Sequence, residues 1–136
     1  MNWASIKQRN KIAVEDMCKY LADRYSEEFG IHPSLCAFIY DRDKHITVMM
    51  PDRDMVVSDN DIMDYLSERW DIFVNVMSDV VGASVKRYSS INWLDGGKFY
   101  SSELYGPYDT YGDALIGVYL ECFRAVHKRI KKSRTI

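Results

Sequence analysis

Histidine and cysteine are the residues of this 136-residue chain that most readily ligate a metal ion or act as nucleophiles, and the chain has three of each. Their spacing fits neither kind of site. The sequence contains no Cys-x-x-Cys, His-x-x-x-His or Glu-x-x-His pair, and His32, His45 and His127 are remote from one another along the chain. The sequence therefore predicts no bound metal and no cofactor.

Serine and glycine residues form no catalytic motif either. Ser89-Ser90 and Ser101-Ser102-Glu103 lie in stretches typical of β-strands, without the sharp strand-to-helix turn that exposes a hydrolase nucleophile. Gly96-Gly97 fits the turn of a hairpin better than a phosphate-binding loop. Because catalysis would need residues gathered from distant parts of the chain, we expect a protein without enzymatic activity.

Charge is the feature that departs most from an even distribution. Residues 41–79 hold ten acidic and four basic side chains, whereas residues 124–136 hold six basic side chains and no acidic one. Acids at a helix start and bases at a helix end complement the helix dipole, which is the simpler interpretation of both segments. The alternative interpretation is functional: an acidic surface that imitates nucleic acid attracts a basic protein, and a basic arm contacts phosphates.

These segments give two sets of candidate binding residues. The partner-binding set joins the acids of the central segment to two aromatic residues of a predicted hairpin: Asp41, Asp43, Asp52, Asp54, Asp59, Asp61, Asp64, Phe38 and Tyr40. The nucleic-acid-binding set is the basic end of the chain: Lys128, Arg129, Lys131, Lys132 and Arg134.

The elements that must position these residues are best marked near the carboxyl end. Residues 98–105 predict an aromatic strand, and a helix follows with Thr110 and Asp113 in the form of a capping box. Leu115 begins one apolar stripe of that helix and Ile116 begins another. A helix that is apolar on two sides is central, so we expect it to pack on a sheet and to be covered by other elements.

The amino-terminal part predicts a helix from Ser5 to a stop at Gly30, followed by a hairpin of residues 35–40 and 45–50. If Tyr40 pairs with His45, the apolar side chains of one face are Leu35, Ala37, Ile39, Ile46, Val48 and Met50. Phe38 and Tyr40 then lie on the opposite, mixed face, which is too apolar for plain solvated surface and is expected to be either half covered or an interface.

The middle of the chain predicts a second helix, capped by Ser58 and running through residues 59–81. A second hairpin follows, with strands at residues 85–93 and 98–105.

The register of that second hairpin has two alternatives. A two-residue loop places Trp93 opposite Lys98, whereas a three-residue loop places Ile91 opposite Phe99 and Arg87 opposite Glu103. We favour the second alternative, because it pairs an apolar residue with an aromatic one and opposite charges with each other.

The resulting fold class is α+β, a helix–hairpin–helix–hairpin–helix chain with its helices packed on an antiparallel sheet. A length of 136 residues predicts a single domain over residues 1–136.

The expected location follows from three features of the sequence. No apolar run approaches the ~20 residues of a membrane span, and the chain does not begin with a signal sequence. Cys18, Cys36 and Cys122 suggest buried free thiols. We therefore expect the protein to be located in the cytoplasm, either of a bacterium or of an infected host cell.

One resemblance rests on the segment Tyr108-Asp109-Thr110-Tyr111-Gly112-Asp113-Ala114-Leu115, which follows the aromatic strand. This last quarter of the chain resembles the ends of small uncharacterised phage and prophage proteins, which carry an acidic pair before the Ala-Leu where this chain has Gly112. It is also distantly similar to the last helix of small antitoxins of the HicB type. Neither resemblance implies functional residues.

Two functions follow as expectations. The first is a non-enzymatic protein-binding module, a phage-type accessory or inhibitor protein that blocks a host machine through its acidic, nucleic-acid-mimicking surface. The second is an antitoxin-like nucleic-acid-binding regulator that uses the basic end, with a homodimer formed through the last helix. A net charge of −2 and an isoelectric point near 5.9 place the basic protein partner ahead of nucleic acid.

Overall fold

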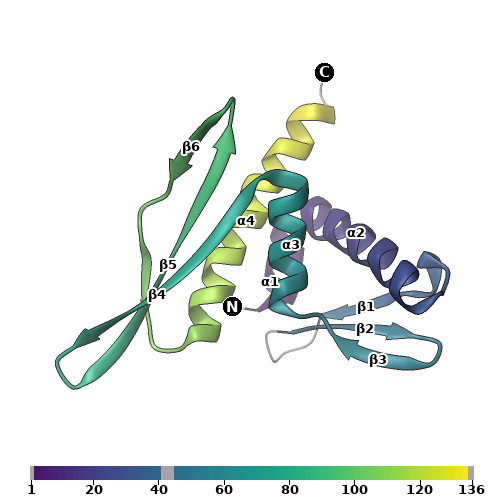
Figure 1. The fold of residues 1–136 in the computed structure, drawn as a ribbon, viewed down its shortest axis with the longest axis horizontal. Coiled ribbons are helices and arrows are strands. Elements are labelled where there is room, and N and C mark those ends of the chain that lie inside the picture. The colour runs from purple at the N-terminus through teal and green to yellow at the C-terminus, as the bar shows by residue number, and fades with distance from the viewer. Residues whose placement is uncertain (1, 41–44, 135–136) are drawn as a thin grey trace.

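A computed structural model of the protein describes residues 2–40 and 45–134. Within these residues the chain forms four α-helices and two antiparallel sheets, which confirms the α+β class (Figure 1). The helices are α1 (Trp3–Arg9), α2 (Lys11–Phe29), α3 (Asp59–Trp70) and α4 (Tyr111–Arg134), with a short 3-10 turn at Pro33–Leu35. The strands are β1 (Ala37–Tyr40), β2 (Ile46–Met50), β3 (Arg53–Val56), β4 (Ile72–Val81), β5 (Ser84–Asp95), β6 (Lys98–Ser101) and β7 (Tyr105–Tyr108).

Three predicted helix ends are confirmed: the starts at Ser58 and Thr110 and the end at Gly30. The Ser58 hydroxyl accepts from the Asp61 N–H at 3.1 Å, and the Thr110 hydroxyl accepts from the Asp113 N–H at 3.0 Å. Gly30 ends α2 in the left-handed region, at φ 64°. The predicted start at Ser5 is wrong, because α1 begins at Trp3 and the Asn2 side chain caps it by accepting from the Ser5 N–H. The first helix was predicted as one piece, but the chain divides it at the buried Asn10 into α1 and α2.

The predicted register of the first hairpin is wrong by one residue. Tyr40 pairs with Ile46 instead of His45, and Phe38 pairs with Val48. A slip of one residue moves a whole set of side chains to the other face of a sheet. Phe38 and Tyr40 therefore lie on the inner face with the buried β2 residues, and Ile39 is on the exposed face. The third strand, β3, was not predicted, and it pairs with β2.

The prediction of helix through residue 81 is also wrong. Helix α3 ends at Trp70, Asp71 takes a left-handed conformation at φ 52°, and β4 follows as a ten-residue strand. The valines of this segment restrict χ1 and favour extended backbone, which outweighs the helical spacing of its apolar residues. The second sheet therefore begins directly after α3, and the predicted helix–hairpin–helix–hairpin–helix arrangement is not confirmed.

The second sheet has the order β4-β5-β6, and β7 also pairs with β5. Neither predicted register of its hairpin is present. Asp95 pairs with Lys98 across the two-residue turn Gly96-Gly97, so Trp93 lies opposite Tyr100. Both glycines have positive φ, as the tight turn between twisted strands requires. Arg87 pairs with Tyr108 of β7, so the favoured pairing of Arg87 with Glu103 is wrong.

Helix α4 is central, as predicted. It packs against β4, β5 and β7 on one side and against α1 and α2 on the other (Figure 1). Leu115, Ile116 and Phe123 are all buried. The Phe123 ring meets Trp3 edge to face, with a centroid separation of 5.2 Å, and stacks on Tyr65 at 6.0 Å. Both apolar stripes of α4 are thereby covered.

Candidate protein-binding surfaces

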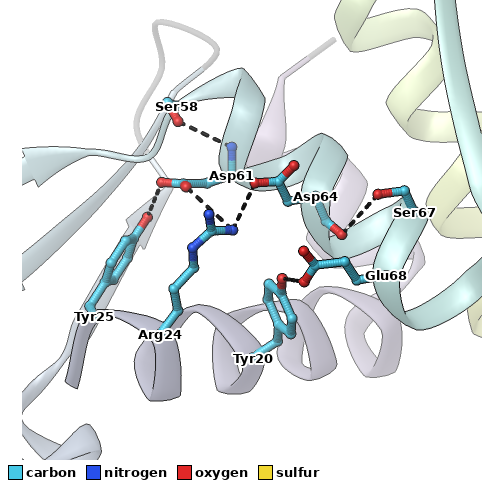
Figure 2. A network of polar contacts seen from close by, with 8 residues as sticks. All are labelled: Tyr20, Arg24, Tyr25, Ser58, Asp61, Asp64, Ser67 and Glu68. Carbon is cyan, nitrogen blue, oxygen red and sulfur yellow. Dashed lines mark hydrogen bonds and ion pairs between the residues drawn. The ribbon is translucent and has the colours of Figure 1, made fainter. Parts of the chain in front are cut away.

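The acidic first turns of α3 face another part of the same chain (Figure 2). The Tyr25 hydroxyl on α2 donates to Asp61 at 2.8 Å, and the Arg24 guanidinium lies 2.9 Å from Asp64 and 3.8 Å from Asp61. Burial raises the pKa of Tyr25, and its hydrogen bond to Asp61 raises that pKa further. These two carboxylates therefore hold α3 against α2.

Two further tyrosine–aspartate bonds repeat this arrangement. The buried Tyr119 on α4 donates to Asp59 at 2.7 Å, and the buried Tyr65 on α3 donates to Asp16 at 2.6 Å. Asp16 also accepts two hydrogen bonds from Arg69, at 2.9 and 3.2 Å. The predicted partner-binding residues of α3, which are Asp59, Asp61 and Asp64, are thus gathered together, and each is engaged by a side chain of α2 or α4.

The remaining predicted acids lie elsewhere. Asp52 is in the β2–β3 turn beside Arg53, whose hydrogen bond lowers the pKa of the Asp52 carboxyl, and the exposed Asp54 is on β3. Asp41 and Asp43 lie outside the described residues. The structure therefore presents Asp52 and Asp54 to solvent on the first sheet, apart from the carboxylates that hold the helices together.

The two predicted aromatic anchors face inward. Phe38 packs against the core, and the Tyr40 hydroxyl lies 3.0 Å from the Cys18 sulfur. The Lys7 ammonium covers the Tyr40 ring at 4.3 Å from its centroid. Burial raises the pKa of the Cys18 thiol to about 11, with the Tyr40 hydrogen bond acting in the opposite direction.

The thiols were expected to be free and buried. All three are free, as predicted, but only Cys122 is buried, whereas Cys18 and Cys36 are half-buried.

The predicted nucleic-acid-binding residues of α4 divide into two groups. Arg129 donates to the Trp70 carbonyl at 3.1 Å and so helps to join the end of α4 to the end of α3. The other four residues of the predicted nucleic-acid-binding set are exposed on the last turns of the helix: Lys128, Lys131, Lys132 and Arg134.

The prominent apolar surface of the described chain is one that the sequence prediction missed. The outer face of the second sheet, which we define as the face turned away from α4, presents Phe73, Met77, Leu94 and Phe99. Phe99 is 70% exposed and Phe73 is 40% exposed, and their rings lie 6.4 Å apart across the sheet. The alternation of Val, Phe and Met in residues 72–81 was the available signal, but it was assigned to a helix.

The β4 strand also has a free edge. Leu94 donates its N–H to the Asp71 carbonyl at 3.0 Å, and bonded pairs alternate along an antiparallel ladder. Odd-numbered residues of β4 therefore bond to β5, and the even-numbered residues direct their N–H and C=O groups away from it. These are Ile72, Val74, Val76, Ser78 and Val80. In the described part of the chain, β4 pairs with β5 alone.

The remaining observations restrict the chemistry. Among the described residues, no group of three or more His, Cys, Asp or Glu side chains is arranged to hold a metal ion, and no described helix is long and apolar enough to cross a membrane. No protein-family model, curated protein or solved structure matches this chain. The phage-type resemblance therefore stays an expectation.

Proposed function

We propose that this chain is a non-enzymatic protein-binding module that takes an extended segment of a partner protein along the β4 edge. The observation that carries the proposal is a row of N–H and C=O groups on alternate residues of a ten-residue strand, which pair with no other strand among residues 2–40 and 45–134. Such a row is the template on which an added strand forms main-chain hydrogen bonds. The bonds supply affinity, and the side chains beside them supply selectivity.

The side chains of β4 define the chemistry of the partner segment. Its outward residues Phe73 and Met77 are 40% and 45% exposed, Val80 near its end is 72% exposed, and Asp79 is its single charged residue. A partner strand with apolar side chains at alternate positions would continue the outer face of the sheet. Burying such side chains is worth about 25 cal/mol per Å² of apolar area.

The exposure of this edge is itself informative. Proteins usually protect a long edge strand with lysine, proline, a bulge or a covering element, because an open edge promotes aggregation. No proline or lysine occurs in residues 72–81, and the pairing of β4 with β5 runs without a bulge. An unprotected edge of this length fits a surface that is covered when a partner is bound.

A single backbone hydrogen provides the test. Ser78→Pro removes an N–H that points away from β5, whereas Ser78→Ala keeps that N–H and removes only the hydroxyl. Peptides about as long as β4 would be selected from a random displayed library on the wild-type protein, and alternating apolar residues are expected among them. Ser78→Pro should weaken their binding by about ten-fold or more, and Ser78→Ala by less than about two-fold. Equal binding to both variants would refute strand addition at this edge.

The narrower form of the proposal is an accessory or inhibitor protein, of the phage type, whose partner is basic. The exposed carboxylates Asp52 and Asp54 support it, because exposed charge accelerates association more than it increases final affinity. The joint change Asp52→Asn and Asp54→Asn should slow the association of a basic partner several-fold at low salt. An unchanged association rate would restrict the interface to the second sheet.

A nucleic-acid-binding regulator is the second candidate, favoured by the exposed Lys128, Lys131 and Arg134 at the end of α4. Binding to a single-stranded oligonucleotide, measured by fluorescence anisotropy, should then fall with salt, and each lost phosphate contact should reduce the slope of log K against log salt by about 0.7. Arg134→Ala should change that slope. A slope near zero would exclude this candidate.

A further inference from the structure

A cleft opens on the inner face of the second sheet, between that sheet and the carboxyl-terminal half of α4, and Ile72 is the residue that it shares with the β4 edge. Its volume is about 350 Å³, within the range of cavities that hold small organic ligands. Figure 1 shows the second sheet alongside α4, with the β5–β6 turn at the same end of the molecule as the carboxyl end of that helix.

The floor and one wall of the cleft are apolar. Ile72 and Ile91 of the sheet and Cys122 of α4 are buried at its base. Trp93 forms a wall and is stacked on Tyr100, with a ring separation of 5.6 Å and an interplanar angle of 16°. The side chain of Ala125 is only a methyl group, so α4 leaves room opposite the sheet. A flat apolar ring system would bury its faces there.

The rim on the α4 side is basic. Arg124, Lys128 and Arg129 line the cleft, with Glu121 as the one carboxylate among the lining residues. Arg124 binds Glu121 at 3.1 Å and Arg129 donates one N–H to the Trp70 carbonyl, but each guanidinium has further N–H donors. The Lys128 ammonium adds a third positive charge on an exposed side chain.

We infer that this cleft binds a small organic anion with a flat apolar body, its ring beside Trp93 and its acidic group against Lys128 and the two arginines. The apolar floor would contribute affinity for the body, and the charge-assisted hydrogen bonds at the rim would orient it. An uncharged ring compound would make no charge-assisted hydrogen bonds at the rim, and an inorganic anion would make no apolar contacts with the floor. Selectivity for a molecule with both parts follows from this division.

The test uses 1-anilinonaphthalene-8-sulfonate, whose fluorescence rises in an apolar site, with N-phenyl-1-naphthylamine as its uncharged counterpart. The folded protein should bind the sulfonate probe with a dissociation constant below about 1 mM, and about ten-fold more tightly than the uncharged compound. Inorganic phosphate should not displace it at a concentration matched to the probe. Binding that is equally strong for the uncharged compound, or that phosphate abolishes, would overturn the inference.

Two matched variants separate this cleft from general attraction to a basic helix. Lys128→Glu reverses a charge at the rim, and Lys131→Glu makes the same change on α4 outside the cleft. Lys128→Glu should weaken probe binding by about ten-fold or more and Lys131→Glu by less than about two-fold. Equal weakening by both variants would show a bulk charge effect and refute the site.

The cleft must also be separated from the apolar outer face, which is a competing surface for the probe. Ala125→Trp fills the cleft and should abolish binding, whereas Phe99→Ser, on the outer face, should leave it unchanged. Loss of binding in Phe99→Ser with retention in Lys128→Glu would place the probe on the outer face and overturn the inference. Lys128 is exposed, so the decisive variant does not depend on repacking the core.

Discussion

Three tyrosine hydroxyls of this protein each donate to an aspartate on a helix other than their own. The pairs are Tyr25 with Asp61, Tyr65 with Asp16, and Tyr119 with Asp59. All three rings are buried, so each pair combines an apolar contact in the core with a charge-assisted hydrogen bond at its margin. The acidic character of residues 59–64 is therefore explained in large part by the packing of α3 against α2 and α4.

Tyr65→Phe should be strongly destabilising, because the Tyr65 hydroxyl donates to Asp16 and its oxygen accepts from the Trp70 indole N–H at 2.9 Å. Removing this hydroxyl leaves the Trp70 N–H and the Asp16 carboxylate with one hydrogen-bond partner fewer each. We expect a loss of about 1–3 kcal/mol in the free energy of unfolding. Tyr20→Phe is the matched control, because its acceptor Glu68 is exposed, and it should cost less than ~0.5 kcal/mol. Urea unfolding of both variants measures the difference, and equal costs would contradict this account.

The same hydroxyls predict a loss of stability at alkaline pH. Burial, reinforced by the neighbouring aspartates, raises the pKa of Tyr25, Tyr65 and Tyr119 above the ordinary value of 10. The folded state then keeps protons that the unfolded state releases, so this contribution to stability is fully present below about pH 10 and falls as the pH rises further. Urea unfolding midpoints should be nearly constant from about pH 7 to 8 and should begin to fall near pH 9, because burial also raises the pKa of the Cys18 and Cys122 thiols. They should drop further above about pH 10 as the tyrosines of the unfolded state ionise. Tyr25→Phe should make that drop shallower.

At the scale of elements, the β4 strand makes a prediction that depends only on its hydrogen-bond alternation. The amide hydrogens of Val74, Val76 and Ser78 point away from β5, and those of Asn75 and Met77 point toward it. Hydrogen exchange followed by NMR should therefore alternate along the strand, with the first group exchanging faster. Uniform protection of both groups would mean that another segment or another molecule covers the edge.

The elements also show how far the sequence could predict the fold. Ser58, Thr110 and Gly30 act within one helical turn, and their predicted effects on helix ends are confirmed. The apolar residues after Trp70 have helical spacing, but the segment forms a strand because its pairing with β5 outweighs that spacing. The valine-rich sequence after Asp71 was the usable signal for a strand.

Less of the candidate site than of the fold could be predicted from the sequence. Phe38 and Tyr40 were predicted to lie on an outer face because a one-residue error in register reverses a strand, and the sequence between Tyr40 and Ile46 carries no decisive turn motif. The cleft between Trp93 and Ala125 joins residues that are distant in sequence and come from different elements. Neither periodicity nor composition determines which of these elements pack side by side.

At the scale of the whole molecule, α4 is the element that joins the two halves of the described chain. One side of it packs on the second sheet, and the other side packs on α1 and α2, where Phe123 contacts Trp3 and Tyr65 (Figure 1). Arg129 adds a hydrogen bond from α4 to the carbonyl of Trp70, the last residue of α3. Because neither half can lose α4 without exposing apolar surface, we predict that residues 1–136 unfold as one cooperative domain.

The three tryptophans allow that prediction to be measured without changing the sequence. Trp3 lies in the helical core, Trp70 ends α3, and Trp93 lies on the inner face of the second sheet. Incorporation of 5-fluorotryptophan gives each position its own ¹⁹F resonance, and the three should show the same midpoint in urea within error, coincident with the loss of helical circular dichroism. An earlier midpoint for Trp93 would mean that the second sheet separates from α4 before the helices unfold. Phe123→Ala should shift all three midpoints together, at a cost of about 3–5 kcal/mol, because the cavity it creates lies in the core that α4 shares with the other helices.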